Sequence, residues 1–169
     1  KNNLHGTFLM MREVYNQWMA QHGGSIVNMC ADMWGGMPGM GHSGAARAGV
    51  DNLTKTAAIE WAVSGVRVNA IAPGWIMSSG MDSYKGDFAK FVIPTLASKV
   101  PLKRMGTESE VSSVTCFLLS EASAFVSGVT VRIDGAASLG TPIYPLTDHE
   151  NSEPYNGFHR AFIPDVLKK

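Results

Sequence analysis

Residues 66–74 read VRVNAIAPG, and this stretch decides the class of fold. Its first seven residues are rich in β-branched and apolar side chains in an alternating pattern, which is typical of a strand, and Pro73-Gly74 breaks the strand at its carboxyl end. Ligands of open α/β sheets bind beyond the carboxyl ends of the strands. The stretch therefore predicts a strand followed by a turn that can face a ligand.

Helices and strands are predicted to alternate on both sides of this strand. Apolar residues at helical spacing predict the first helix, which a pair of glycines ends, and Thr107-Glu108-Ser109-Glu110 has the pattern of a capping box. The predicted elements are, in chain order, a helix over 4–19, a strand over 25–29, a helix over 43–62, the strand over 66–72, a helical segment over 82–100 interrupted by Pro94, a helix over 111–119 and a strand over 129–133. This order implies right-handed crossovers and a parallel sheet, hence an α/β fold.

Bulk composition fits one ordinary globular domain. The chain has 169 residues and a formal net charge of zero, and its cations are scattered singly. Nucleic-acid and anionic-membrane surfaces need clustered Lys and Arg, so neither partner is expected. No apolar stretch reaches the ~20 residues that span a bilayer. Cys30 and Cys116 are expected to be reduced, buried thiols, which favours a cytoplasmic location.

Several segments resemble the short-chain dehydrogenase/reductase family at the expected distances from one another. They are residues 3–8 (NLHGTF), 24–28 (GSIVN), 46–50 with 53–55 (ARAGV and LTK), 66–74 and 128–135. The resemblance implies a Rossmann-type, doubly wound parallel sheet of which residues 1–140 are the C-terminal half, with three strands and flanking helices. Residues 141–169 are then a C-terminal extension, which either docks on a neighbouring subunit or packs loosely. In the family, the glycine-rich loop and the residue that selects the cofactor precede the first of these segments, so no residue here chooses between NAD and NADP.

The resemblance also implies where the nicotinamide cofactor binds. By this comparison the Pro73-Gly74 turn faces the nicotinamide, the backbone of Ile76 contacts its carboxamide, and Ser78 stands where the family usually has Thr near the phosphates. The predicted cofactor contacts are Met29, Arg47, Pro73, Gly74, Ile76 and Ser78. No metal site is predicted.

The family's catalytic Tyr-x-x-x-Lys falls on Ser43 and Arg47, and its upstream Ser falls on Ala31 or Asp32. The family's Tyr is a general acid, with a pKa lowered from ~10, and a Ser hydroxyl is far less acidic. Reduction of an enoyl thioester instead leaves an enolate whose oxyanion needs hydrogen-bond donors. The candidate catalytic residues are Asn3, His42, Ser43 and Arg47. The alternatives are a helix cap for Asn3, a loop spacer for His42 and a surface charge for Arg47.

Residues 42–50 and 52–55 resemble the peroxisomal trans-2-enoyl-CoA reductase branch and its bacterial relatives, some of which look like citronellol or citronellal dehydrogenases. A second frame in that branch, Tyr-Asn-Leu-Thr-Lys, has Asp51 in place of its Tyr here. The resemblance implies an NADP- or NAD-dependent oxidoreductase that acts on an enoyl-CoA or similar apolar acyl or terpenoid substrate. An alcohol or aldehyde dehydrogenase and a degenerate scaffold subunit are the alternatives, and a homotetramer is expected.

A cluster of methionines is predicted to surround the pocket, where flexible thioethers suit an elongated apolar chain. Its members are Met29, Met33, Met37, Met40, Met77 and Met81. The alternative is that these side chains fill the core.

Overall fold

The computed structural model describes residues 2–140, 144–157 and 162–168. They form two compact units: a first unit within residues 1–72 and 114–131, and a second unit within residues 73–113 and 132–169. The predicted α/β class is confirmed, with a parallel strand pair and flanking helices. Phe158 and Ala161, which the sequence places in the extension, lie outside the described residues.

The central sheet has three strands in the order β1-β2-β5: β1 spans Gly24–Met29, β2 spans Val66–Pro73 and β5 spans Thr130–Ile133. Strands β1 and β2 pair in parallel, from Gly24 opposite Val66 to Met29 opposite Ile71. All three strands were predicted to within two residues. In the described part of the chain, β1 is paired on one side only, so it is an edge of this sheet.

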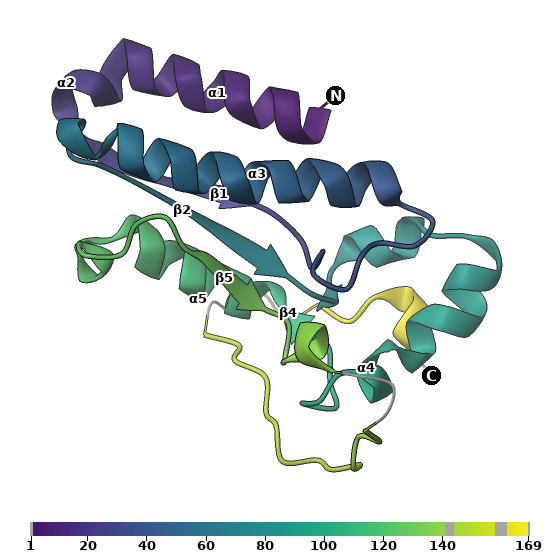
Figure 1. Cartoon of the computed structure of the whole chain (residues 1–169). Coiled ribbons are helices and arrows are strands. Elements are labelled where there is room, and N and C mark those ends of the chain that lie inside the picture. The colour runs from purple at the N-terminus through teal and green to yellow at the C-terminus, as the bar shows by residue number, and fades with distance from the viewer. Residues whose placement is uncertain (1, 141–143, 158–161, 169) are drawn as a thin grey trace. The chain divides into compact units, whose positions relative to one another are not determined.

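Two long helices of the first unit lie side by side along β1 and β2 (Figure 1). The first runs from Asn2 to His22 and contains α1 (Thr7–Val14) and α2 (Ala20–His22), joined by a π-helical turn. It ends at Gly23, whose φ of 70° is a conformation that favours glycine. The second helix, α3, spans Gly41–Glu60.

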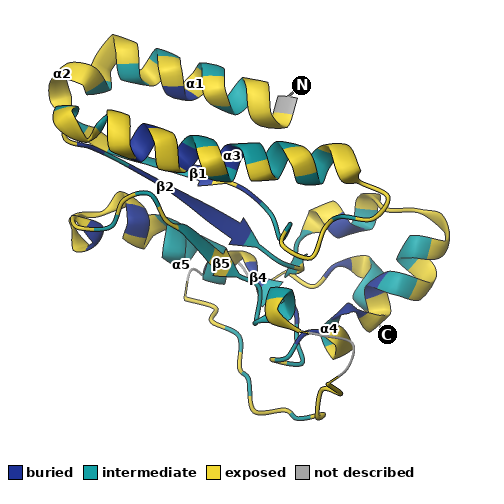
Figure 2. Cartoon of the chain, viewed as in Figure 1, coloured by how far each residue is buried: buried dark blue, intermediate teal, exposed yellow. Residues whose placement is uncertain are grey.

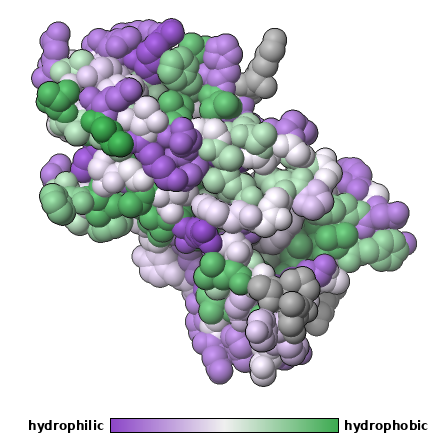
Figure 3. Space-filling model, in the orientation of Figure 1, coloured by the Kyte–Doolittle hydropathy of each residue, from purple (hydrophilic) through white to green (hydrophobic). Residues whose placement is uncertain are grey.

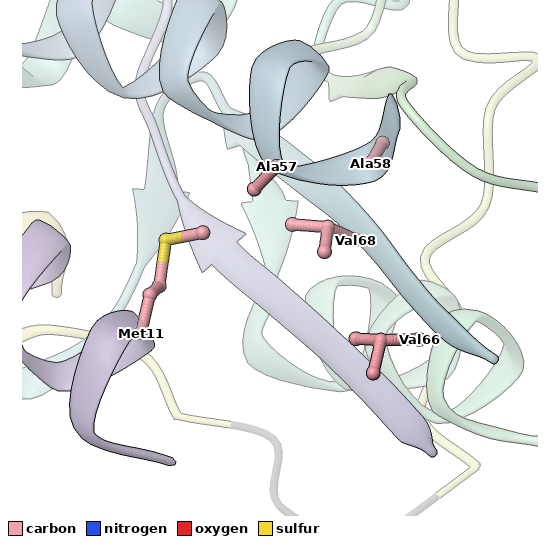
Figure 4. Packing of buried hydrophobic residues seen from close by; sticks show 5 residues of the cluster. All are labelled: Met11, Ala57, Ala58, Val66 and Val68. Atoms are coloured by element: carbon pink, nitrogen blue, oxygen red, sulfur yellow. The ribbon is translucent and has the colours of Figure 1, made fainter. Parts of the chain in front are cut away.

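A small apolar core holds these helices to the strands. Side chains of α1, α3 and β2 meet there, as Figure 4 shows for Met11, Ala57, Ala58, Val66 and Val68. Strand β2 is buried along almost its whole length (Figure 2), which is typical of a central parallel strand. This packing fixes the carboxyl ends of β1 and β2 relative to α3.

The second unit begins where β2 ends and contains a strand pair that the sequence did not predict. Strands β3 (Ile76–Met77) and β4 (Gly106–Thr107) pair in parallel, and two residues each are too few to show a period. Between them lies the predicted helical segment. It has a separate turn at Ser79–Ser83 and then a run of consecutive pieces: a π-helical turn at Phe88–Val92, a 3₁₀ third turn at Ile93–Thr95 and α4 (Leu96–Lys99). Pro94 lies in the third turn, as expected.

The capping box is confirmed at the start of α5 (Glu108–Leu119). The Thr107 amide donates to Glu110 Oε2 at 2.9 Å, and the Glu110 amide donates to Thr107 Oγ1 at 3.3 Å. These reciprocal bonds satisfy two amides that a helix start leaves without partners. No helix among the described residues is long and apolar enough to cross a membrane. On the face in Figure 3, apolar and polar residues are interspersed.

Candidate active site

A cavity of about 380 Å³ in the first unit brings three of the predicted site residues together. Asn3 from the first helix, Met29 from the end of β1 and Arg47 from α3 all line it. The remaining lining is largely apolar and includes Met10 and Met11. Of the predicted methionine cluster only Met29 lines this cavity.

Arg47 supplies the positive charge at this cavity. Its Nη1 donates to the carbonyl oxygen of Met29 at 3.3 Å, a long hydrogen bond that holds the guanidinium beside the end of β1. Its Nε is buried and has no hydrogen-bond partner. A buried donor without a partner costs free energy, so this N–H is suited to an oxygen atom of a ligand.

Asn28 also lines the cavity, and sequence reasoning missed it as a site residue. It is 6% exposed, and its Nδ2 donates to Thr54 Oγ1 at 2.9 Å. Thr54 Oγ1 donates in turn to the Val50 carbonyl oxygen at 2.8 Å. The signal in the sequence was an amide within an apolar strand, because a buried amide needs dedicated partners.

His42 lies apart from this group. It lines a separate, mostly apolar cavity of about 520 Å³ together with Leu4, Phe8 and Leu53. Ser43 is half-buried on the same helix and lines neither cavity. Asp32 is half-buried in the loop after β1. The structure thus groups Asn3 and Arg47 but not the other two candidate catalytic residues.

Asp51 and Lys55, which stand at the Tyr and Lys positions of the second frame, belong to a structural network. Asp51 Oδ2 accepts from Lys55 Nζ at 2.6 Å, and Asp51 Oδ1 accepts from Thr130 Oγ1 at 2.7 Å, which ties α3 to β5. Burial acts to raise the pKa of Asp51, but the hydrogen bonds from Lys55 and Thr130 and the charge of Lys55 outweigh it and lower the pKa. The carboxylate is therefore ionised near neutral pH and is not a proton donor.

Cys30 follows β1 and is buried close to Arg47, as expected. The same expectation is wrong for Cys116, which is exposed on α5. Burial, followed by the charge of Asp51, raises the pKa of the Cys30 thiol to about 11. Cysteine nucleophiles react as thiolates, so this thiol is inert near neutral pH.

The predicted cofactor turn lies in the second unit. The Gly74 amide donates to the Ile133 carbonyl oxygen at 3.0 Å. A Cβ at Gly74 would lie 2.8 Å from Asp134 Cβ and 3.0 Å from its Cα, so only glycine fits. Ile76 follows in β3, opposite Gly106, and Ser78 precedes the turn Ser79–Ser83.

These residues fit a nicotinamide cofactor in two respects. Arg47 lines a cavity, and one of its buried N–H groups has no hydrogen-bond partner. Gly74 lets the turn pack closely against Asp134 at the carboxyl end of β2, the end of a strand at which ligands of open α/β sheets bind. Among the described residues there is no group of three His, Cys, Asp or Glu that could hold a metal ion.

Comparisons with known proteins show the family of the chain. A family model described as enoyl-(acyl carrier protein) reductase matches residues 1–138. The peroxisomal 2,4-dienoyl-CoA reductase of Danio rerio is 39% identical over 138 residues, which are 79% of this chain and 45% of that protein.

Solved structures show the same family and its cofactors. A citronellol catabolism dehydrogenase of Pseudomonas aeruginosa PAO1 is 61% identical with a TM-score of 0.68, over 80% of this chain and 51% of that one. A gluconate 5-dehydrogenase of Burkholderia cenocepacia J2315, solved with NADP and tartrate, is 28% identical with a TM-score of 0.71, over 82% of this chain and 54% of that one. The chain thus spans about half the length of the proteins it matches. From its fold, its motifs and these matches, the chain belongs to the short-chain dehydrogenase/reductase family.

Proposed function

We propose that this chain carries part of the active site of an NAD- or NADP-dependent oxidoreductase that reduces an enoyl-CoA or a similar apolar acyl or terpenoid substrate. The observation that carries the proposal is that Arg47 lines a cavity with Asn3 and Met29 and that its buried Nε has no hydrogen-bond partner. Relatives that bind NADP or reduce dienoyl-CoA support it.

The donors at the cavity favour enoyl reduction over carbonyl reduction. The residues lining it include amides, a hydroxyl and a guanidinium but no tyrosine or lysine. Carbonyl reduction needs a proton for the developing alkoxide, which these groups supply poorly near neutral pH. Reduction of an enoyl thioester leaves an enolate, and a fixed guanidinium stabilises that oxyanion by hydrogen bonding. The enolate then takes its proton at Cα from water, so no acidic side chain is required.

The nicotinamide, when bound, supplies the hydride. Arg47 would hold an oxygen of the cofactor ribose or of the substrate, and Asn3 would bind water at the cavity. Pro73 and Gly74 end the strand, the backbone of Ile76 would bind the carboxamide, and Ser78 would bind the phosphates. Met29, Met10 and Met11 provide an apolar lining suited to an acyl or terpenoid chain.

An alcohol or aldehyde dehydrogenase of the citronellol type is the second candidate. The identity of 61% with a citronellol catabolism dehydrogenase favours it. That reaction needs an acid or base at the alcohol oxygen, and His42 or Ser43 would have to provide it. Loss of turnover of citronellol in the His42→Ala variant, with enoyl turnover unchanged, is the outcome that would select this candidate.

The test is fluorescence titration with NADPH and NADH, followed by turnover of crotonyl-CoA, a 2,4-dienoyl-CoA and citronellal. It is made on this chain and on any longer natural protein that contains it. We expect Arg47→Ala to weaken cofactor binding by about tenfold, the loss of one charge-assisted hydrogen bond. The control is Arg12→Ala. Arg12 is exposed, and its guanidinium donates to the neighbouring Glu13 carboxylate. Absence of binding in every form leaves a degenerate scaffold subunit.

A homotetramer and a cytoplasmic location remain proposals for the whole protein. Large apolar side chains that are exposed in the first unit, such as Phe8 and Trp18, support self-association. Light scattering after size exclusion measures the oligomeric state directly.

A further inference from the structure

The part of the chain that follows the family-matched residues 1–138 is bonded to the second unit. We call its described residues, 144–157 and 162–168, the C-terminal extension. The Lys103 side chain is 9% exposed, and its Nζ contacts Asp148 Oδ1 at 2.9 Å and the Leu146 carbonyl oxygen at 3.4 Å. The extension therefore supplies the charge partner of a nearly buried cation, and Lys103 is its first anchor.

The next residue, Arg104, also binds the extension. Its Nε donates to Ser152 Oγ at 2.9 Å and its Nη2 to the Glu153 carbonyl oxygen at 3.2 Å. Glu110 of the capping box accepts from the Tyr155 amide at 3.2 Å, and Thr107 Oγ1 donates to the Tyr155 carbonyl oxygen at 3.0 Å. The start of α5 is thus a second anchor.

The third anchor is apolar and lies at the end of the extension. Val166 and Leu167 pack against the cluster of Met81, Ile93, Leu96 and Met105. The Val166 amide donates to Asp82 Oδ1 at 3.1 Å. Pro164 is fully buried, whereas the neighbouring Ile163 is 58% exposed.

The third anchor falls on the segment from Ser79 to Lys99. This segment begins with a separate 3₁₀ turn, Ser79–Ser83, which contains Met81 and Asp82, and continues from Phe88 to Lys99 as consecutive π-helical, 3₁₀ and α-helical pieces. A separate turn of five residues is marginal on its own, because nucleation costs more than a single turn returns. Tertiary contacts therefore have to hold this segment.

We propose that the C-terminal extension locks residues 79–99 in position through Val166 and Asp82. This is a positioning role, since neither residue is placed at the cavity or at the cofactor turn. Residues 79–99 directly follow the turn at Pro73–Ser78, so their position affects how substrate is bound. That consequence rests on the proposed function, while the locking itself does not.

Hydrogen exchange of the intact chain tests the locking. Val166→Asp places a charge in the apolar cluster, and Ile163→Asp places the same charge on an exposed neighbour as the matched control. We expect amides within 79–99 to exchange about tenfold faster in Val166→Asp alone, with β1 and β2 unchanged. Equal exchange in wild type and Val166→Asp overturns the proposal.

If Val166→Asp unfolds the whole chain, Asp82→Ala tests whether the extension locks residues 79–99. It removes the acceptor for the Val166 amide without burying a charge. Faster exchange confined to 79–99 supports the proposal, and unchanged exchange overturns it.

Steady-state kinetics of the active protein test the consequence for substrate. In Val166→Asp or Asp82→Ala, we expect the loss of positioning to raise KM by about tenfold and to leave kcat within about twofold of wild type. A fall in kcat at constant KM overturns the positioning role. Failure to bind NADPH or NADH contradicts the proposed function and leaves the exchange result intact.

Discussion

The surroundings of Arg47 and of Arg104 differ in how fully each guanidinium is bonded. Arg104 binds Glu110 through two nitrogens, at 2.9 and 2.6 Å, and also binds Ser152 and two carbonyl oxygens. Arg47 makes one bond of 3.3 Å, and its Nε is buried without a partner. Both arginines are half-buried, but the guanidinium of Arg104 is fully hydrogen-bonded and that of Arg47 is not.

This difference separates an arginine that holds the fold from one that is available to a ligand. A guanidinium has five N–H donors, and a structural site uses them on the protein. A site that leaves a buried donor free gives up stability, which a bound oxygen restores. The contrast predicts that the two arginines respond in opposite ways in stability and binding experiments.

The largest expected effect is on the stability of the second unit. Arg104→Ala leaves the Glu110 carboxylate without its charge partner at a site where the two side chains are 22% and 17% exposed. Breaking such a pair is expected to lower the free energy of unfolding by about 2 kcal/mol, less than for a fully buried pair. Urea denaturation measures the change.

Arg47→Ala is the matched variant in the first unit, and Arg12→Ala the surface control. Both are expected to change the free energy of unfolding by less than about 0.5 kcal/mol. If Arg47→Ala lowered the free energy of unfolding more than Arg104→Ala, Arg47 would be structural, and the difference between the two arginines would not hold.

A smaller effect is the pH dependence around Glu110. Burial acts to raise its pKa, but hydrogen bonds from Arg104 and from the Thr107 and Tyr155 amides, with the charge of Arg104, outweigh burial and lower the pKa from 4.5. The ionised carboxylate therefore stabilises the fold above pH 4.5, and this contribution is lost as the pH falls from 4.5 through the lower folded-state pKa.

Glu110→Gln removes this contribution. Denaturation midpoints of wild type and variant should differ most at pH 6–7 and converge as the pH falls below about 4. Midpoints that stay equally far apart down to pH 2 would contradict the assignment of the ion pair.

A gain in stability is expected at a strained position of the second unit. Ala136 has φ 68° and ψ 14°, a left-handed conformation. Its amide is held by Asp134 Oδ1 at 2.9 Å. Ala136→Gly should raise the free energy of unfolding by about 0.5–1 kcal/mol, because glycine adopts this conformation without a steric penalty.

Ala137→Gly is the control, since the next residue begins a 3₁₀ turn. It should lower stability by about 0.5 kcal/mol through the entropy of the unfolded chain. A loss in both variants would mean that Ala136 is not strained.

Much of the fold could be predicted because its signals are local. Gly23 ends the first helix, Thr107 and Glu110 open α5, and β2 ends at Pro73 as expected. Strands β3 and β4 could not be predicted, since two residues show no period and their pairing is not local.

The candidate site was predictable only in part. Residues at motif positions, such as Asn3 and Arg47, line the same cavity, whereas His42 lies at another. Asn28 was missed although an amide within an apolar strand is a signal, because its partner Thr54 lies 26 residues away in sequence and the contact shows only in three dimensions.

The sequence by itself determined the order of helices and strands, the family and the absence of its usual Tyr and Lys. These depend on residue identity and local spacing. Only the tertiary structure decided which donors are used and which are free. Arg104 binds Glu110, Met105 and an extension some 50 residues away in sequence, whereas the buried Nε of Arg47 has no partner. The reason is physical, because hydrogen-bond satisfaction depends on which distant groups folding brings within about 3 Å of a buried donor.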